Sequence, residues 1–138
     1  MIRIGTCLVA ALLVAATAFA AQDDIIGTFK GSEKLTLTAC SNSTYDGISK
    51  STWEATIQDL NGNSYKGKAS NANGNFEIDG QITGSETSGT LKGVNKWGQA
   101  WTGEFKGTLE DNRYKSKATG SVPASGCQFV SEVEASKI

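Results

Sequence analysis

Strict alternation of apolar and polar residues is the feature of this chain that most constrains its fold. From Trp101 to Leu109, every second residue is apolar or glycine, and the residues between them are Thr, Glu, Lys and Thr. The same period of two continues through most of the chain after Ile25. This period is typical of strands that bury one face, and no window in the region has a convincing helical period. The chain is therefore expected to be all-β.

Turn-forming residues separate the alternating runs. Asn-Gly pairs occur in "DLNGNS" (residues 59–64) and in "NANGN" (residues 71–75), and this pair tolerates the positive φ of tight hairpins. The spacing predicts an antiparallel up-and-down meander of about eight or nine strands. One apolar face per strand leaves two architectures, a closed barrel or a two-sheet sandwich. We favour the closed barrel because closure removes exposed strand edges.

A short motif, glycine–x–large apolar–x–glycine, recurs along the chain. It occurs as "GTFKG" (residues 27–31), "GTLKG" (89–93) and "GEFKG" (103–107), with a looser copy in "GQITG" (80–84). Each copy is expected to place one large side chain inward between two glycines, which make room for a bulky neighbour and let the strand coil. No copy is followed by a helix pattern, which argues against a phosphate-binding loop. We interpret the motif as structural.

The first twenty residues have the features of a secretory signal peptide. Arg3 gives a positive start, residues 4–19 are nearly all apolar or small, and Ala18-Phe19-Ala20 fits the small-x-small cleavage rule. We predict cleavage after Ala20, so that residues 1–20 are the signal peptide and residues 21–138 form a single β-barrel domain. The mature chain is predicted to be secreted or periplasmic, with no membrane span.

Charge and cysteine content narrow the function further. The formal net charge is −1 and the lysines are spread singly, which argues against a nucleic-acid partner. Outside the signal, the chain has two cysteines, Cys40 and Cys127. An oxidising compartment favours a disulfide between them. The alternatives are two unpaired thiols or bonds to other chains.

Residues for catalysis or metal binding are scarce. The chain has no histidine, which removes the commonest general base and the commonest metal ligand. With both cysteines oxidised, neither a thiolate nucleophile nor a thiolate metal site is expected. We therefore predict no enzyme activity, no metal and no cofactor. A hydrolase with paired carboxylates stays as a weaker alternative, which would require two opposed acidic side chains in a cleft.

Aromatic residues are the candidates for a binding site. They occupy apolar-face positions opposite many small residues, so they either fill the interior as a solid core or line a pocket for a small ligand. Trp97 is close to a turn at Gly98 and is predicted to be exposed, which makes it the best candidate for a ligand or partner contact. The predicted ligand-binding residues are Trp53, Tyr65, Trp97, Trp101 and Tyr114.

These features give the chain a resemblance to small exported β-barrels of the calycin and avidin type. The resemblance rests on "GTF" at the opening of the first strand, on the short hairpins and on inward tryptophans in later strands. It departs at Phe29, where those families usually have tryptophan. The resemblance implies a ligand-binding barrel and does not name the ligand. Together with the aromatic residues and the scarcity of catalytic residues, it leads us to predict a non-enzymatic module that binds a small apolar or ring-shaped ligand. The glycine-rich strands also resemble barrels attached to bacterial surface receptors, which implies protein binding instead, as an inhibitor, adhesin or assembly subunit.

Overall fold

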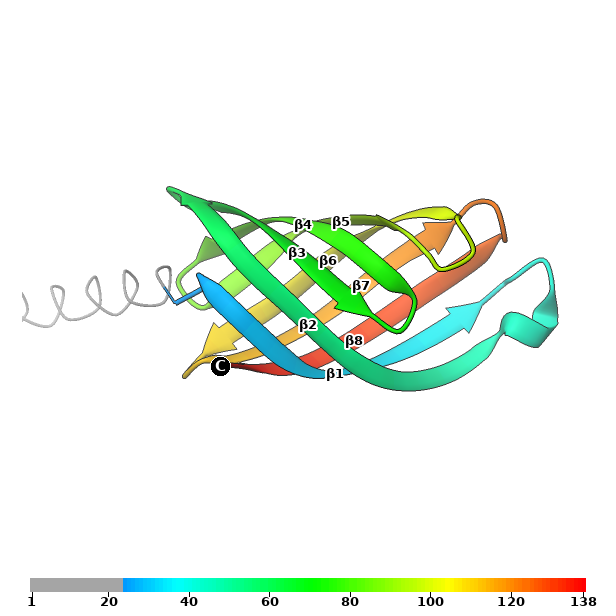
Figure 1. The fold of residues 1–138 in the computed structure, drawn as a ribbon, viewed down its shortest axis with the longest axis horizontal. Helices are drawn as coiled ribbons and strands as arrows, with labels where there is room; N and C mark the ends of the chain where they lie inside the picture. Colours follow the sequence, from blue (N-terminus) through cyan, green and yellow to red (C-terminus); the bar gives the residue numbers. More distant parts are fainter. Residues whose placement is uncertain (1–23) are drawn as a thin grey trace, which may run out of the picture.

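A closed barrel of eight antiparallel strands forms the whole described part of the protein (Figure 1). The computed structural model describes residues 24–138, and the predicted signal peptide lies outside them. Each strand pairs with the next along the chain, and β8 pairs with β1 to close the barrel rather than leaving a sandwich. The predicted meander is therefore confirmed. The elements are β1 (Gly27–Thr38), a 3-10 helix η1 (Ser43–Tyr45), β2 (Gly47–Asn61), β3 (Ser64–Asn71), β4 (Gly74–Thr83), β5 (Glu86–Val94), β6 (Ala100–Glu110), β7 (Arg113–Val122) and β8 (Cys127–Lys137).

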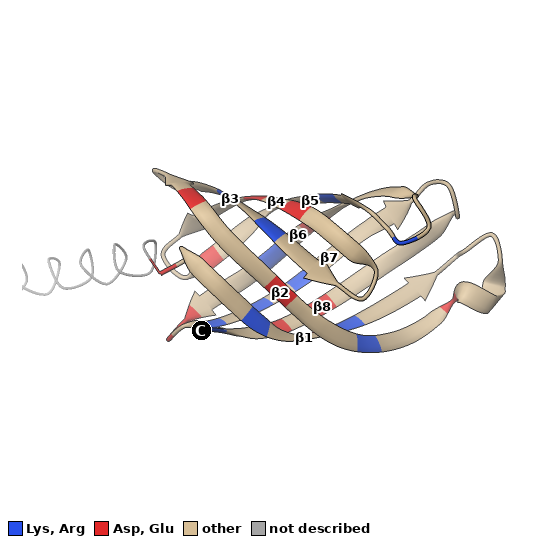
Figure 2. Ribbon diagram, viewed as in Figure 1, with Lys and Arg blue, Asp and Glu red and all other residues tan. Residues whose placement is uncertain are grey.

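The alternation in the sequence becomes an apolar inside and a polar outside. In β4, Phe76 and Ile78 are buried, whereas Glu77 between them is exposed. Charged residues occur along most strands (Figure 2), and nearly all of them are exposed. Direct cross-strand partners form ion pairs there, such as Lys92 with Glu77 at 3.6 Å. Exposed pairs of this kind contribute at most about 1 kcal/mol each, so the interior carries most of the stability.

Glycines allow the strands to approach closely, as the repeated motif predicted. A Cβ on Gly31 would lie 1.9 Å from the backbone oxygen of Glu134 on β8. A Cβ on Gly80 would lie 2.3 Å from Cζ of Tyr65 on the neighbouring strand. Both glycines therefore make room, one for backbone and one for a bulky ring. Gly84 differs, because it lies after the end of β4 with φ of 61° and belongs to a turn.

A disulfide between Cys40 and Cys127 links the region after β1 to the start of β8. Nearby, the Ser41 backbone N–H donates to the Ser125 carbonyl oxygen at 2.8 Å. The predicted pairing of the cysteines is confirmed. It joins residues 87 positions apart, and it fixes the two strands whose pairing closes the barrel.

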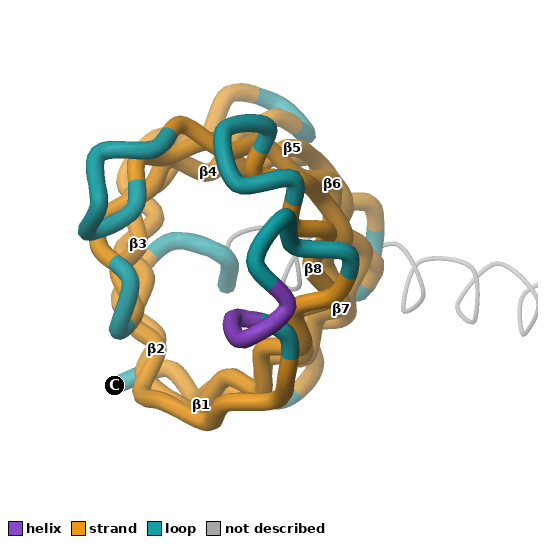
Figure 3. The backbone as a smooth tube through the Cα atoms, turned by 90° about the vertical axis from the view of Figure 1, so that its right-hand side faces the viewer, coloured by secondary structure: helices purple, strands orange, loops and turns teal. Residues whose placement is uncertain are grey.

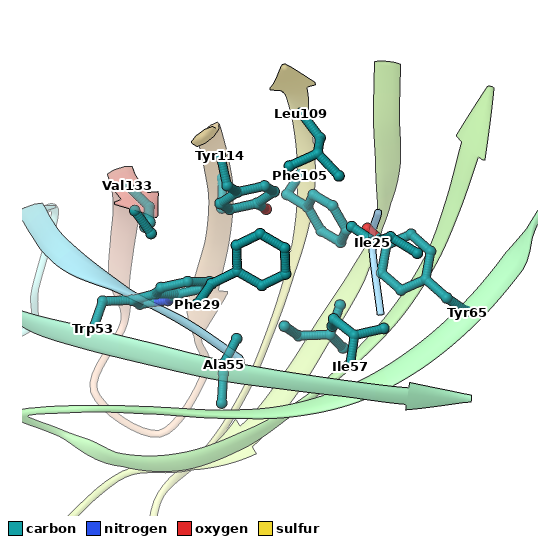
Figure 4. Packing of buried hydrophobic residues seen from close by; sticks show 14 of the residues in the cluster. Ile25, Phe29, Trp53, Ala55, Ile57, Tyr65, Phe105, Leu109, Tyr114 and Val133 are labelled. Carbon is teal, nitrogen blue, oxygen red and sulfur yellow. The ribbon is translucent and has the colours of Figure 1, made fainter. Parts of the chain in front are cut away.

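Large side chains fill the end of the barrel that contains Ile25 (Figure 4). Ile25 precedes β1 and is 2% exposed. Tyr65 is also buried at this end, and its hydroxyl bonds to that of Thr87. Because Thr87 gives its own proton to the Gln81 carbonyl oxygen, Tyr65 is the donor in this bond. Burial raises the pKa of Tyr65 to about 12, so its phenol stays neutral within this core.

Candidate functional site: a cavity at the open end

Four connections gather at the other end of the barrel and surround its opening (Figure 3). They are the β1–β2, β3–β4, β5–β6 and β7–β8 connections. The first contains η1, which begins where the Asn42 side chain accepts a hydrogen bond from the Thr44 backbone N–H at 3.1 Å. This single helical turn was not predicted, because the sequence pattern has no convincing helical period there. The loops form a mouth above the hollow part of the barrel.

The cavity below this mouth has a volume of about 510 Å³. This size is within the usual range for small-molecule sites. Some of the residues that line the cavity, such as Ser49 on β2, carry small side chains that leave space in the interior. Among the lining residues are Glu33, Leu35, Leu37, Trp53, Asn71, Phe76, Leu91, Trp97, Trp101, Tyr114, Ser116, Phe129 and Ser131.

Two groups of aromatic rings form much of the cavity wall. Trp53 and Tyr114 stack with their ring centroids 5.5 Å apart and an interplanar angle of 10°. The ring centroid of Trp101 lies 5.3 Å from that of Phe76 and 5.5 Å from that of Phe129, which it meets edge-on. Such pairs add about 0.5–1.5 kcal/mol each beyond their buried area. Burial raises the pKa of Tyr114, so its phenol stays neutral and can take part in hydrogen bonding.

A second aromatic contact lies at the mouth. Tyr45 from η1 and Trp97 from the β5–β6 connection have ring centroids 6.3 Å apart. Trp97 is 61% exposed, and the ammonium of Lys96 lies 4.7 Å from the centroid of its ring. The Trp97 backbone N–H donates to Asn95 Oδ1 at 3.1 Å, so a compact turn positions the indole. This turn separates Trp97 from Trp101, and the two do not share one continuous strand.

One carboxyl group, that of Glu33, faces the cavity. It is 5% exposed, on β1 between Gly31 and Leu35. Oε1 accepts a hydrogen bond from Asn71 Nδ2 at 3.0 Å, and Oε2 accepts one from Ser131 Oγ at 2.6 Å. Burial raises the pKa of Glu33, while the hydrogen bonds from Ser131 and Asn71 act in the opposite direction. The carboxyl group is thus held in a fixed orientation by neighbours on β3 and β8.

The structure brings four of the five predicted binding residues together around the cavity: Trp53, Trp97, Trp101 and Tyr114. The fifth, Tyr65, lies in the filled end and does not line the cavity. Glu33 was missed, although the alternation through Phe29 and Leu35 places it on the inward face. An acidic residue at an apolar-face position was the available signal. The role of these residues in binding a ligand stays a prediction.

Other kinds of site are not assembled within residues 24–138. In this part of the chain, no three histidine, cysteine or acidic residues gather closely enough to hold a metal ion. Glu33 is the single acidic residue among the cavity-lining residues described, so a pair of opposed carboxylates is not present there. Among the same described residues, no helix is long and apolar enough to cross a membrane.

Comparisons with known proteins relate this chain to others through its fold. No protein-family model and no curated protein sequence matches it. A crystal structure of a "putative outer membrane protein" from Bacteroides fragilis superposes with a TM-score of 0.64 and 14% identity, over 85% of this chain and 52% of that one. A DUF3598-family protein of unknown function from Nostoc punctiforme superposes with a TM-score of 0.51 and 10% identity, over 84% and 48%. The chain thus spans about half the length of each structure, and the likeness is one of fold.

Proposed function

We propose that this protein is an exported, non-enzymatic binding module that holds a small organic ligand in the cavity at its open end. The observation that carries the proposal is the contrast between the two ends of one barrel. One end is packed with large side chains, whereas the other encloses about 510 Å³ lined by aromatic rings and one fixed carboxyl group. Packing alone would favour filling this space, because an empty apolar cavity destabilises a protein. The calycin-type and avidin-type resemblance agrees with this function.

The extracytoplasmic location in this proposal rests on two observations. The disulfide between Cys40 and Cys127 suits an oxidising compartment. Residues 1–20 have the pattern of a secretory signal. In addition, nearly all charged residues of the strands are exposed, and a charged exterior is suited to water rather than to lipid chains.

Native mass spectrometry of the protein purified from its own compartment tests the proposal. A mass excess that disappears on denaturation is expected from a retained ligand. A matched pair of variants locates the site, because Ser49 lines the cavity whereas the adjacent Lys50 alternates to the outer face. Ser49→Trp should fill the mouth and abolish retention, and Lys50→Trp should leave retention unchanged. A bare chain that also binds no small molecule in solution would refute the proposal.

A second candidate function, binding to a protein partner, is favoured by the exposed rim. Tyr45 and Trp97 are 57% and 61% exposed and lie side by side at the mouth. Exposed aromatic residues of this kind are enriched at protein interfaces. This function predicts that Trp97→Ala abolishes capture of the partner while Ser49→Trp, which fills the cavity below, leaves capture intact. A small-molecule site is instead expected to lose binding in Ser49→Trp, because the cavity itself is then filled.

A further inference from the structure

We propose that the cavity selects a ligand that carries a protonated amine on an apolar or aromatic body, and that the carboxylate of Glu33 pairs with this amine. The inference rests on the proposed function and names the chemical class of its ligand. It depends on three properties of the site. The hydrogen bonds around Glu33 suit its ionised form, no cation among the described residues pairs with it, and aromatic rings lie near it.

The hydrogen bonds around Glu33 suit its ionised form. Each oxygen accepts one bond from a neutral donor, Asn71 on one side and Ser131 on the other. A carboxylate accepts such bonds at both oxygens, and each oxygen keeps a further lone pair for another donor. An ammonium group in the cavity has N–H bonds to offer to these lone pairs. The two neutral neighbours therefore orient the carboxylate without satisfying it fully.

The charge of Glu33 is not balanced within residues 24–138. The ion pairs found in this part of the chain all join exposed side chains. Across the strands, Glu33 is opposite Ser51 on β2 and Val133 on β8, and both are neutral. Lys96 is the one basic residue among the cavity-lining residues described, but it is exposed at the mouth, with its ammonium over the ring of Trp97, and it forms no ion pair with Glu33. A buried carboxylate without a cation is unfavourable, so a ligand that brings the cation is favoured.

Aromatic rings near the carboxylate favour the same kind of ligand. Asn71, which donates to Glu33, is the direct cross-strand partner of Trp53. Trp53 in turn stacks on Tyr114. The faces of indole and phenol rings attract cations as well as apolar surface. A ligand with an ammonium group at Glu33 would therefore place its apolar body among the rings of the wall.

A purely structural role for Glu33 makes a different prediction. The side chain links β1 to β3 and β8, and a neutral side chain of the same shape would maintain that link. Glu33→Gln keeps the shape and a hydrogen-bonding head group but removes the charge. If the carboxylate were only a link, this substitution would not change which ligand charge the cavity prefers.

The test uses isothermal titration calorimetry with ring compounds that are matched in shape and differ in charge. One set is phenethylamine, phenethyl alcohol and hydrocinnamate, and a larger set is tryptamine, tryptophol and indolepropionate. We expect each amine to bind at least about tenfold more tightly than its alcohol, which corresponds to about 1.4 kcal/mol, and more tightly than its carboxylate. Glu33→Gln should remove this preference. Glu132→Gln, which removes an exposed carboxylate from β8, should leave it unchanged.

Three outcomes would overturn the inference, and they affect the proposed function differently. If alcohols bind as tightly as amines, or if the preference survives in Glu33→Gln, the amine class is wrong while a ligand-binding cavity remains supported. If no probe of either set binds to the wild-type protein, the amine inference also fails. The retained mass seen by native mass spectrometry then decides separately whether the cavity holds another kind of ligand.

Discussion

Removal of the disulfide should destabilise the barrel by several kilocalories per mole. Cys40 and Cys127 are 87 positions apart, and in the chain-entropy model a closed loop of that length contributes about 4.6 kcal/mol. The unfolded chain is not a random coil, so the measured value is expected at about 3–5 kcal/mol for the Cys40→Ala/Cys127→Ala double variant. At about 4 °C per kcal/mol for a domain of this size, the melting temperature should fall by about 12–20 °C.

Urea unfolding of the wild type and the double variant, with and without dithiothreitol, measures this contribution. The variant should also have a larger m-value, because its unfolded state exposes more surface than a cross-linked chain. Reductant should lower the stability of the wild type toward that of the variant and leave the variant unchanged. A loss below about 1 kcal/mol would refute the reasoning, since it would mean that loop closure contributes little to the free energy of unfolding.

Three further predictions concern the site and the strand packing. Trp97→Ala should weaken ligand binding and lower the free energy of unfolding by less than about 1 kcal/mol, because Trp97 is exposed. Trp101 is partly buried, so Trp101→Ala should abolish binding and lower the free energy of unfolding by about 2–3 kcal/mol. Equal losses of stability in urea unfolding would contradict this. Burial raises the pKa of Glu33 in the folded protein above 4.5, so the free energy of unfolding should fall as pH rises from 4.5 through the folded pKa. Glu33→Gln should flatten that part of the stability–pH profile, measured by thermal unfolding. An unchanged pH dependence in the variant would contradict this prediction. Gly31→Ala should lower stability by about 3 kcal/mol, because the added Cβ would lie 1.9 Å from a backbone oxygen, while Ser32→Ala on the outer face should have little effect; similar urea midpoints for the two variants would argue against close strand contact at this position.

Much of the fold follows from the sequence because it depends on local rules. The alternation identified the inward residues of β4 and β6, and the turn residues placed the hairpins between the strands. The polar residues 110–113, at the junction of β6 and β7, form a tight turn in which both Asp111 and Asn112 have positive φ. The single pair of cysteines left one connectivity within the chain. The strands and turns depend on residues that are neighbours in the sequence, and the disulfide pairing depends only on the number of cysteines.

The site was harder to predict because it depends on how far the strands are staggered around the barrel. The alternation of apolar and polar residues places both Tyr65 and Trp53 in the barrel interior, but it does not indicate which end of the barrel each one occupies. Tyr65 proved to be in the filled end with Thr87, whereas Trp53 lines the cavity. The link from Glu33 to Asn71 crosses from β1 to β3 and joins residues 38 positions apart. Such a contact depends on the three-dimensional register, which the sequence pattern does not contain.

The order of the strands has a consequence for how the chain folds. Seven of the eight strand pairings join neighbours in sequence and need only short loops, whereas the β1–β8 pairing, which includes Phe29 with Lys137, brings together the two ends of the described chain. Because long-range closure carries the larger entropic cost, we expect this seam to form last. Until it forms, β1 and β8 each have a free edge that can pair with another molecule. The disulfide lies at one end of this seam, so oxidation would fix the register of the last pairing and oppose exchange of strands between molecules.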